Sequence, residues 1–419
     1  MSPAINLLRN KTFAALEVPN YRLYVGGQAI SLIGTWMQMA AQSWLVLELT
    51  HSATWLGVIV ALQTLPVLFF GPYGGVIADR VDKRKAMVVL QTMMGVQALI
   101  LGVLTVTHVV RIWEIGGLAV LLGFNNAFEN PARQSFMLEL VGPEHLRNAV
   151  SLNSTLVNVA RVLGPGVGGV LIAAVGTGPC FLINAASFVA VVSSLVRMDA
   201  TALSPATPTP RGKGQLREGL RYMRREPSIA LPLGMMAIVG CLTYEFQVSL
   251  PYMASHGLHA GSAGYGFMTA AMGAGAVAGG LVVATRGQTG AWPLVLAAVG
   301  FGSAMTFATV APDLIFELFA LAFVGGASIA FMSQANATLQ LASAPEMRGR
   351  VMSLWFVAFQ GSTPIGGPVV GAVMSQFGPR AGLGLGAVAC FVVAVGGAAA
   401  VRALRARAVG GGAAAVIAR

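Results

Sequence analysis

Residues 75–85 of this chain read Gly75-Val-Ile-Ala-Asp79-Arg80-Val-Asp82-Lys83-Arg84-Lys85. The stretch follows an apolar run at 54–78 and precedes another at 86–107. Each run reaches the length of roughly 20 residues that a helix needs to cross a bilayer. A short basic connection between two such runs is typical of a tight cytoplasmic loop, because Lys and Arg stay on the cytoplasmic side. The stretch therefore predicts a membrane protein with a spanning helix on each side of this loop.

The composition supports a protein that crosses the membrane many times. Hydrophobic residues make up 56 % of the 419 residues and charged residues only 10 %, whereas soluble domains carry about 25 % charged residues. The mean hydropathy is +0.73. The net charge of +11 would suggest a nucleic-acid partner in a soluble chain. Here the charges lie in loops, so we expect membrane lipids and no nucleic acid as partners.

Apolar segments long enough to span a bilayer recur along the chain, separated by short loops except at 198–228. We expect an all-α membrane protein with twelve transmembrane helices near residues 24–47, 54–78, 86–107, 114–136, 148–174, 179–197, 229–253, 263–284, 292–310, 316–337, 351–375 and 382–402.

The basic residues predict the orientation. Of the 26 Lys and Arg, only Arg111 and Arg380 fall in loops assigned to the outside, and Arg133 and Arg161 fall within spans. The others lie in the termini and in the loops assigned to the cytoplasm, so both termini are expected there. We expect no removable signal peptide before the first span.

The chain repeats in its second half. Gly164-Pro165-x-x-Gly168 returns as Gly367-Pro368-x-x-Gly371, about half the chain later. Parallel repeats of this kind place a transport site between two pseudo-symmetric halves. We expect a six-helix half at 1–197, a cytoplasmic linker at 198–228 that contains an amphipathic surface helix, a second six-helix half at 229–402 and a cytoplasmic tail at 403–419.

The charged loop resembles the loop 2–3 signature of the major facilitator superfamily, although the usual Gly after Arg80 is replaced. The resemblance implies the fold of that superfamily and a conformational latch on the cytoplasmic side. The latch would be formed by Gly75, Asp79, Arg80 and Arg84. The alternative is an ordinary basic anchoring loop. Since the corresponding segment around Arg286 lacks the Asp, the latch is expected to be asymmetric.

A second motif resembles the Gly-Pro-rich segment of antiporters in that superfamily. It comprises Gly164, Pro165, Gly168 and Gly169, with Ala160 where an earlier Gly is common. Gly and Pro in a spanning helix permit a bend and a close helix contact. The resemblance implies an antiporter-like kink, and the alternative is a packing feature without meaning for transport.

Further strings resemble the bacterial transmembrane secretion effector group, which includes the enterobactin exporter. They begin at Asn20, Ser31, Trp44, Asn130 and Leu152. The resemblance implies a bacterial inner-membrane exporter of small organic molecules, driven by proton exchange. The substrate would be a drug-like amphiphile or a siderophore. A lipid or lysolipid flippase and a non-transporting receptor or scaffold are the alternatives, and we expect a monomer.

Polar residues within the spans are the candidates for the transport site, because polar groups in lipid are costly. Polar side chains recur every three or four residues from Gln28 to Gln42, on one helical face that lines a cavity or bonds to neighbouring helices. In the fourth span, Glu129 and Arg133 are one turn apart and can pair, and Pro131 opens the backbone locally. Glu129 is the leading proton carrier, and a static pair is the alternative.

Arg161, expected near mid-membrane, would bind an anionic group or steady a glutamate. In the second half Glu245 lies among aromatic and polar residues that suit an amphiphile, whereas Glu317 is expected at the interface. The expected proton-coupling residues are Glu129, Arg133, Arg161 and Glu245, and the expected substrate-binding residues are Thr35, Gln38, Gln42, Asn126, Asn158, Arg161, Tyr244, Gln247, Trp355 and Phe359.

Neither ATP hydrolysis nor metal binding has support in the sequence. No glycine-rich phosphate loop ends in Lys-Ser or Lys-Thr, so ATP hydrolysis is not indicated. The five His residues show no metal-ligand spacing. We therefore expect no enzymatic activity, no metal and no cofactor, and a small molecule and protons as the transported species.

Overall fold

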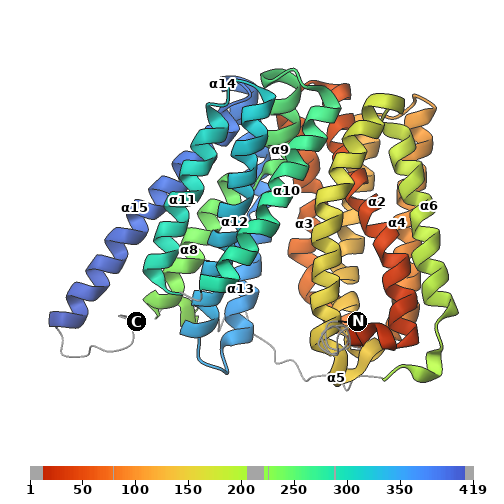
Figure 1. The fold of residues 1–419 in the computed structure, drawn as a ribbon, viewed down its shortest axis with the longest axis horizontal. Helices are drawn as coiled ribbons and strands as arrows, with labels where there is room; N and C mark the ends of the chain where they lie inside the picture. The colour runs from red at the N-terminus through yellow and green to blue at the C-terminus, as the bar shows by residue number, and fades with distance from the viewer. Residues whose placement is uncertain (1–12, 79, 205–220, 225, 287–288, 411–419) are drawn as a thin grey trace, which may run out of the picture. The chain divides into compact units, whose positions relative to one another are not determined.

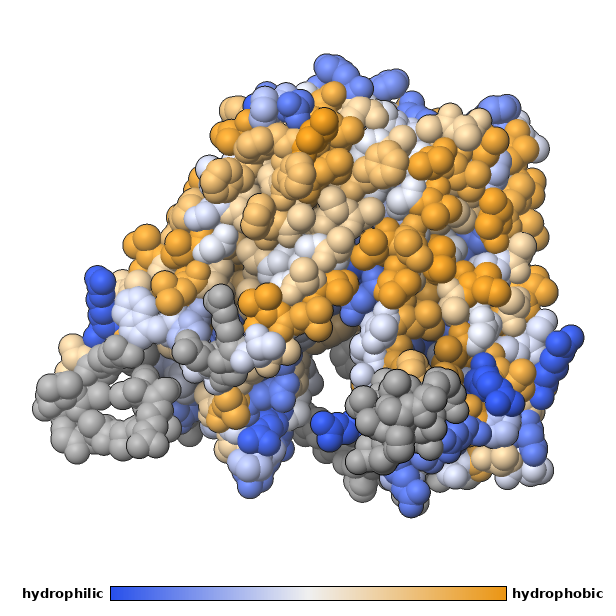
Figure 2. All heavy atoms as spheres, viewed as in Figure 1, coloured by the Kyte–Doolittle hydropathy of each residue, from blue (hydrophilic) through white to orange (hydrophobic). Residues whose placement is uncertain are grey.

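The computed structural model describes residues 13–78, 80–204, 221–224, 226–286 and 289–410. In this part of the chain the regular structure is entirely helical (Figure 1). Figure 2 shows hydrophobic side chains along the visible faces of the helices and hydrophilic side chains toward their ends. This distribution is the one expected for helices whose middle lies in hydrocarbon.

The first part of the chain consists of long helices and two short turns. The elements are η1 (Ala14–Glu17), α2 (Pro19–Thr50), α3 (Ala53–Ala78), α4 (Lys83–Val106), α5 (Ile112–Val175), α6 (Thr177–Arg197) and η2 (Ala200–Ala202).

Helix α5 corresponds to two of the expected spans. Its 64 residues are interrupted at Gly142, whose φ is 70° and ψ 173°. A positive φ costs glycine little because it has no Cβ. Pro143 follows, and proline is favoured where a helix begins. Gly142 thus joins the spans expected at 114–136 and 148–174 without an intervening loop.

The second part of the chain is also helical. Its elements are α8 (Pro227–Leu242), α9 (Phe246–Tyr252), the π-helical turn η3 (Met253–Gly257), α10 (Gly261–Arg286), α11 (Ala291–Thr309), α12 (Leu314–Ala342), α13 (Arg348–Gln360), α14 (Thr363–Phe377) and α15 (Ala381–Gly410).

All twelve expected spans fall on helices. By length and composition, 9 helical segments of the described residues are apolar enough to cross a membrane. One of them is α5, which holds two spans. Helix α2 and the pair α13–α14 fall outside this set.

The chain divides into two compact units, Met1–Leu49 with Leu62–Pro210 and Thr50–Ala61 with Arg211–Arg419. The start of α3 therefore packs with the second unit, which the sequence pattern did not indicate. The Thr54 hydroxyl is 3.1 Å from the Ser375 hydroxyl on α14. A Cβ on Gly57 would collide with the carbonyl oxygen of Gly367, so a small residue at 57 permits this approach.

Most of the linker, at 205–220 and 225, lies outside the described residues, and with it most of the expected surface helix. Residues 221–224 are helical. Tyr222 and Met223 pack against a buried cluster formed by Ile229, Leu233, Leu339, Val351 and Leu354. The end of the linker is thus held by apolar contacts with α8, α12 and α13.

Candidate functional site

The charged segment at 80–85, which runs into the start of α4, is fixed within the first unit by buried contacts. Lys83 is only 6 % exposed, and its Nζ lies 2.6 Å from Oε1 of Glu139 on α5. The Arg84 guanidinium donates to the carbonyls of Leu195 and Val196 at 2.7 and 2.6 Å. These carbonyls belong to the last turn of α6, which has no intrahelical donors for them. Lys83 therefore ties the start of α4 to α5 just before the interruption at Gly142, and Arg84 ties it to the end of α6.

Only part of the expected latch lies among the described residues. Asp79 lies outside the described residues, as do the surroundings of Gly75, while Arg80 is exposed. Asp82 caps α4 by accepting a hydrogen bond from the Lys85 amide at 3.0 Å. The contacts of Arg84 are structural contacts within its own unit, and the latch role stays a prediction.

The Gly-Pro motif of α5 is a close-packing surface. A Cβ on Gly164 would lie 2.5 Å from the Cβ of Trp36 and 2.9 Å from the Ile33 carbonyl oxygen on α2. A Cβ on Gly168 would lie 3.2 Å from Met37. Helical dihedral angles continue through Pro165 and Gly169, since within α5 only Gly142 departs from them. The helix is therefore unbroken at this motif and its contacts fit the packing alternative, while the antiporter-like kink stays a prediction.

Glu129 on α5 is the centre of a buried charged cluster. It is 4 % exposed, and Nε of Arg133 lies 3.4 Å from its Oε1. Gln91 on α4 donates to the same oxygen at 3.1 Å. Arg133 also donates to Asn130 Oδ1 at 3.0 Å. The predicted pairing of Glu129 with Arg133 is confirmed, and Gln91 is a partner that the sequence analysis missed. The backbone near Pro131 remains helical.

Arg161 does not reach this cluster. Its guanidinium lies over the Trp36 ring, 5.1 Å from the ring centroid, at a distance typical of a cation–π contact. Its Nε is buried without a hydrogen-bond partner, and no described carboxylate lies within 4.0 Å of its side chain. Within the described residues, the suggested pairing of Arg161 with a glutamate is not formed in this conformation.

A cluster of carboxamides joins three helices of the first unit. Asn184 on α6 donates to Gln38 on α2 at 2.6 Å, and Gln38 donates to Gln97 on α4 at 3.1 Å. Gln42 donates to Gln63 at 3.4 Å. The polar face of α2 thus bonds to neighbouring helices, which was the alternative to a cavity.

The same face also borders a cavity of about 70 Å³. Both interpretations of the polar stripe therefore apply to it. Thr35 and Asn126 lie in the cavity wall, whereas Asn158 donates to the Ser154 carbonyl of its own helix. The wall is formed by Thr35, Gln38, Met39, Gln42, Gln63, Met94, Gln97, Leu122, Asn126, Asn184 and Phe188.

In the second unit, the spanning run that begins with α8 breaks beside Glu245. Helix α8 ends at Leu242 and α9 begins at Phe246. Glu245 is 3 % exposed, and its Oε1 has no hydrogen-bond partner. A Cβ on Gly366 of α14 would lie 2.8 Å from that oxygen. The break therefore places a buried carboxyl against the backbone of α14.

Aromatic side chains surround this break. The Tyr244 hydroxyl donates to the Ser328 carbonyl at 2.6 Å, and its ring lies 5.1 Å from that of Phe359. Phe359 in turn lies 5.7 Å from Trp355. Tyr244 and Phe359 are packed residues here, and Gln247 is partly buried on α9. Trp355 borders a hollow of about 520 Å³ with Met332, Ser333, Asn336, Ala337, Gln340 and Leu341.

Glu317, expected near the membrane interface, lies at the start of α12 and is 0 % exposed. Neither carboxyl oxygen has a hydrogen-bond partner. Because α12 lies against both α10 and α11, even its first turn is covered by protein.

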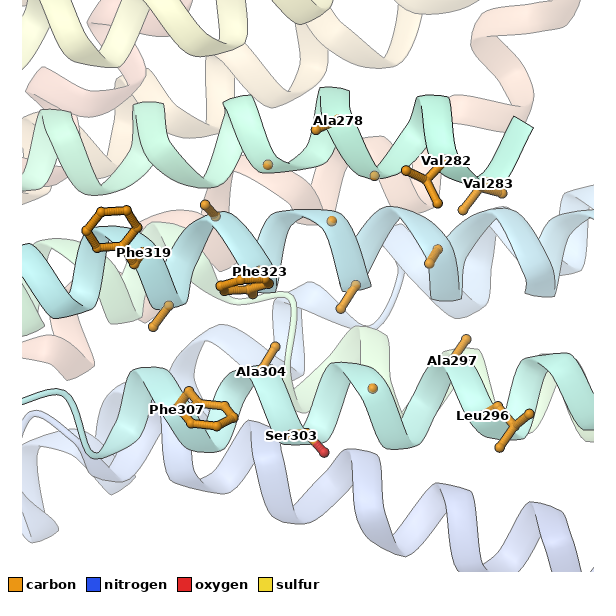
Figure 3. Close-up of a pocket in the computed structure, with 18 of the residues that line it drawn as sticks. Ala278, Val282, Val283, Leu296, Ala297, Ser303, Ala304, Phe307, Phe319 and Phe323 are labelled. Carbon is orange, nitrogen blue, oxygen red and sulfur yellow. The ribbon is translucent and has the colours of Figure 1, made fainter. Parts of the chain in front are cut away.

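A long apolar groove runs between α10 and α11, with α12 as its floor (Figure 3). Its volume is about 1090 Å³, and no charged residue lines it. Phe319 and Phe323 project from α12 beside Phe307 of α11 in Figure 3. Glycines at 275, 279 and 326 let α10 and α12 touch backbone to backbone. Their contact leaves the groove beside α11, where hydrocarbon or an alkyl chain fits.

Among the described residues, no group of three His, Cys, Asp or Glu side chains is placed to hold a metal ion.

Comparison with known proteins identifies the family. Residues 10–409 match the model of the family described as transmembrane secretion effector. The chain belongs to that family. It is therefore a transport protein of the major facilitator fold and not an enzyme, and the sequence-based assignment is confirmed.

The relatives include exporters. The chain is 25 % identical over 383 residues to the enterobactin exporter of Shigella boydii, covering 90 % of this chain and 89 % of the relative. It is 24 % identical to macrolide efflux protein A of Streptococcus pyogenes, covering 81 % and 85 %. A match to the uncharacterized transporter YfiS of Bacillus subtilis, at 29 % identity, covers 54 % of this chain and only 55 % of that relative.

A solved structure supports the fold. The nucleoside transporter NupG, in a mutant form, aligns with a TM-score of 0.74 at 12 % identity, over 93 % of this chain and 99 % of that one. At this identity the likeness shows the fold alone. The expected all-helical membrane fold is confirmed, and the protein is related to efflux pumps and siderophore exporters of bacteria.

Proposed function

We propose that this protein exports small organic compounds across the bacterial cytoplasmic membrane by alternating access, in exchange for protons. Family membership and the names of the relatives support export. The substrate class remains a drug-like amphiphile or a siderophore, as those names suggest for the relatives themselves. The protein is proposed to act as a monomer.

The observation that carries proton coupling is the buried Glu129–Arg133 pair. Two further hydrogen bonds support the pair, one from Gln91 to Glu129 and one from Arg133 to Asn130. Removing a partner from a buried charge is costly, by about 3–5 kcal/mol. A conformational change that separates Arg133 from Glu129 therefore favours uptake of a proton by the carboxylate, and re-formation of the pair favours its release.

Substrate and proton would act within the same unit. Asn126, in the cavity wall, precedes Glu129 by less than one turn of α5. Its carbonyl accepts a hydrogen bond from Asn130 at 3.0 Å, and Asn130 accepts from Arg133. A ligand that displaces Asn126 would act on the partners of Glu129. Glu245, with an unpartnered carboxyl oxygen, is the second candidate proton site.

One observation favours a second candidate function, a lipid or lysolipid flippase. The groove between α10 and α11 is apolar, lined by small residues and phenylalanines, and of a size that holds an alkyl chain. An amphiphile entering from the bilayer would use such a surface.

The two candidates are separated by transport into proteoliposomes under an imposed pH gradient. The probes are ethidium, enterobactin and a fluorescent lysolipid. Proton-driven accumulation of ethidium or enterobactin supports the proposed function. Movement of lysolipid alone supports the flippase, and movement of no probe with the gradient contradicts proton-driven export.

A further inference from the structure

The carboxamide cluster of the first unit is a hydrogen-bond chain with an open end. Ser187 donates to Asn184 Oδ1 at 2.9 Å, Asn184 donates to Gln38 at 2.6 Å, and Gln38 donates to Gln97 Oε1 at 3.1 Å. The chain stops at Gln97 Nε2, which is buried without a partner. Gln97 itself is 6 % exposed.

The open donor lies beside the cavity of about 70 Å³, because Gln97 is one of its lining residues. Liquid water occupies about 30 Å³ per molecule, so the cavity holds about two waters or one small functional group. Buried polar groups are almost always hydrogen-bonded in native proteins. An unpartnered N–H on a side chain that lines a cavity therefore points to an acceptor that enters it.

The lining decides the chemistry of that acceptor. Its polar side chains are one hydroxyl and six carboxamides, and no charged residue lines the cavity. An ionised group would enter without a counter-charge, which is costly in a buried site. An apolar group would leave Gln97 Nε2 unsatisfied. An uncharged oxygen meets both conditions.

We propose that this carboxamide cavity binds an uncharged acceptor oxygen of the transported compound, that is, a hydroxyl, carbonyl or ether oxygen, with Gln97 as its donor. The proposal rests on the proposed function, because it takes the transported compound as the ligand. It predicts a preference for oxygen-rich neutral groups over aromatic cations without oxygen. Gln97 and Asn184 become specificity-determining residues together with Gln38.

The test compares two probes in purified protein. Chloramphenicol carries neutral hydroxyl and carbonyl oxygens, and tetraphenylphosphonium carries none. Gln97→Met removes the donor while keeping an unbranched side chain of similar length. We expect this change to weaken chloramphenicol binding by about three- to tenfold, with tetraphenylphosphonium binding unchanged within a factor of two.

The matched control is Thr105→Val on the same helix. Thr105 is buried, donates to the Leu101 carbonyl of its own helix and does not line the cavity. It should alter neither affinity, and unchanged phosphonium binding shows that each variant is folded. The proposal is overturned if Gln97→Met weakens the binding of both probes equally or leaves chloramphenicol affinity unchanged. It is also overturned if the wild-type protein does not bind chloramphenicol.

Transport separates this inference from the proposed function. If Gln97→Met selectively weakens chloramphenicol binding but wild-type protein shows no proton-driven flux, the site stands and the export function fails. If the wild-type protein exports phosphonium with the proton gradient but Gln97→Met binds chloramphenicol as tightly as the wild type, the export function stands and the site fails.

Discussion

Nε of Arg133 lies 3.4 Å from Oε1 of Glu129, one turn apart on α5, and Gln91 of α4 donates to the same oxygen. The three side chains form a buried cluster in which only Arg133 keeps partial contact with solvent, at 23 % of its side chain. A buried carboxylate is stable in its charged form only while a cation pairs with it. The pair is therefore the place at which we propose that proton uptake is coupled to a conformational change.

Removal of the cation should destabilise the protein more than removal of both charges. Arg133→Met leaves the Glu129 carboxylate buried and unpaired, and we expect it to lower the free energy of unfolding by about 3 kcal/mol. The double variant Glu129→Gln with Arg133→Met should recover most of that loss. Thermal unfolding in detergent measures both, and equal destabilisation of the single and double variants would show that the pair is not the cause.

Because α5 packs closely on α2, adding a single methyl group at Gly164 should lower the stability of the protein. Gly164→Ala would place its Cβ against Trp36 and the Ile33 carbonyl, and we expect a loss of about 1–3 kcal/mol. Gly117→Ala on the same helix is the control, because nothing lies within 4 Å of its Cβ position. That change should be neutral or stabilising by up to about 1 kcal/mol. Similar melting temperatures for the two variants would refute the packing role.

The latch hypothesis predicts a transport defect without a folding defect. Asp79→Ala removes a carboxylate expected at a helix end, worth about 0.3–2 kcal/mol, so we expect a transport rate lowered by about two- to thirtyfold at normal protein levels. Asp82→Ala is the comparison, since Asp82 caps α4 and its loss should cost about 1 kcal/mol of stability with little change in rate. A wild-type rate in Asp79→Ala vesicles would remove the latch role.

The spans were predictable because hydrophobic length is a local property of the sequence. The Glu129–Arg133 pair was predictable for the same reason, since a spacing of four residues fixes which helical face both side chains occupy. The burial of Lys83 and Glu317 was not, because each is covered by helices distant in sequence. Their charge suggested positions in loops or at interfaces. In the structure Lys83 pairs with Glu139 and Glu317 is covered by protein.

The candidate site was predictable in part. Gln38 was recognised from its helical face, but its partners Gln97 and Asn184 come from α4 and α6 and have no spacing relation to it. One signal was available, namely that both are polar residues within apolar runs and so need a partner or a cavity. The grouping of residues 50–61 with the second unit also had no local signal, since α3 is one continuous helix.

The central claim is that Glu129 carries the coupling proton, and the most direct test compares flux in proteoliposomes with and without an imposed pH gradient. Glu129→Gln keeps the shape of the side chain but cannot exchange a proton, whereas the control Glu114→Gln removes a carboxylate from the capping box at the start of α5. We predict that Glu129→Gln abolishes proton-driven accumulation of substrate while downhill flux or exchange continues, and that Glu114→Gln accumulates substrate as the wild type does. If Glu129→Gln still concentrates substrate when the pH gradient is imposed, Glu129 is structural and the account is contradicted.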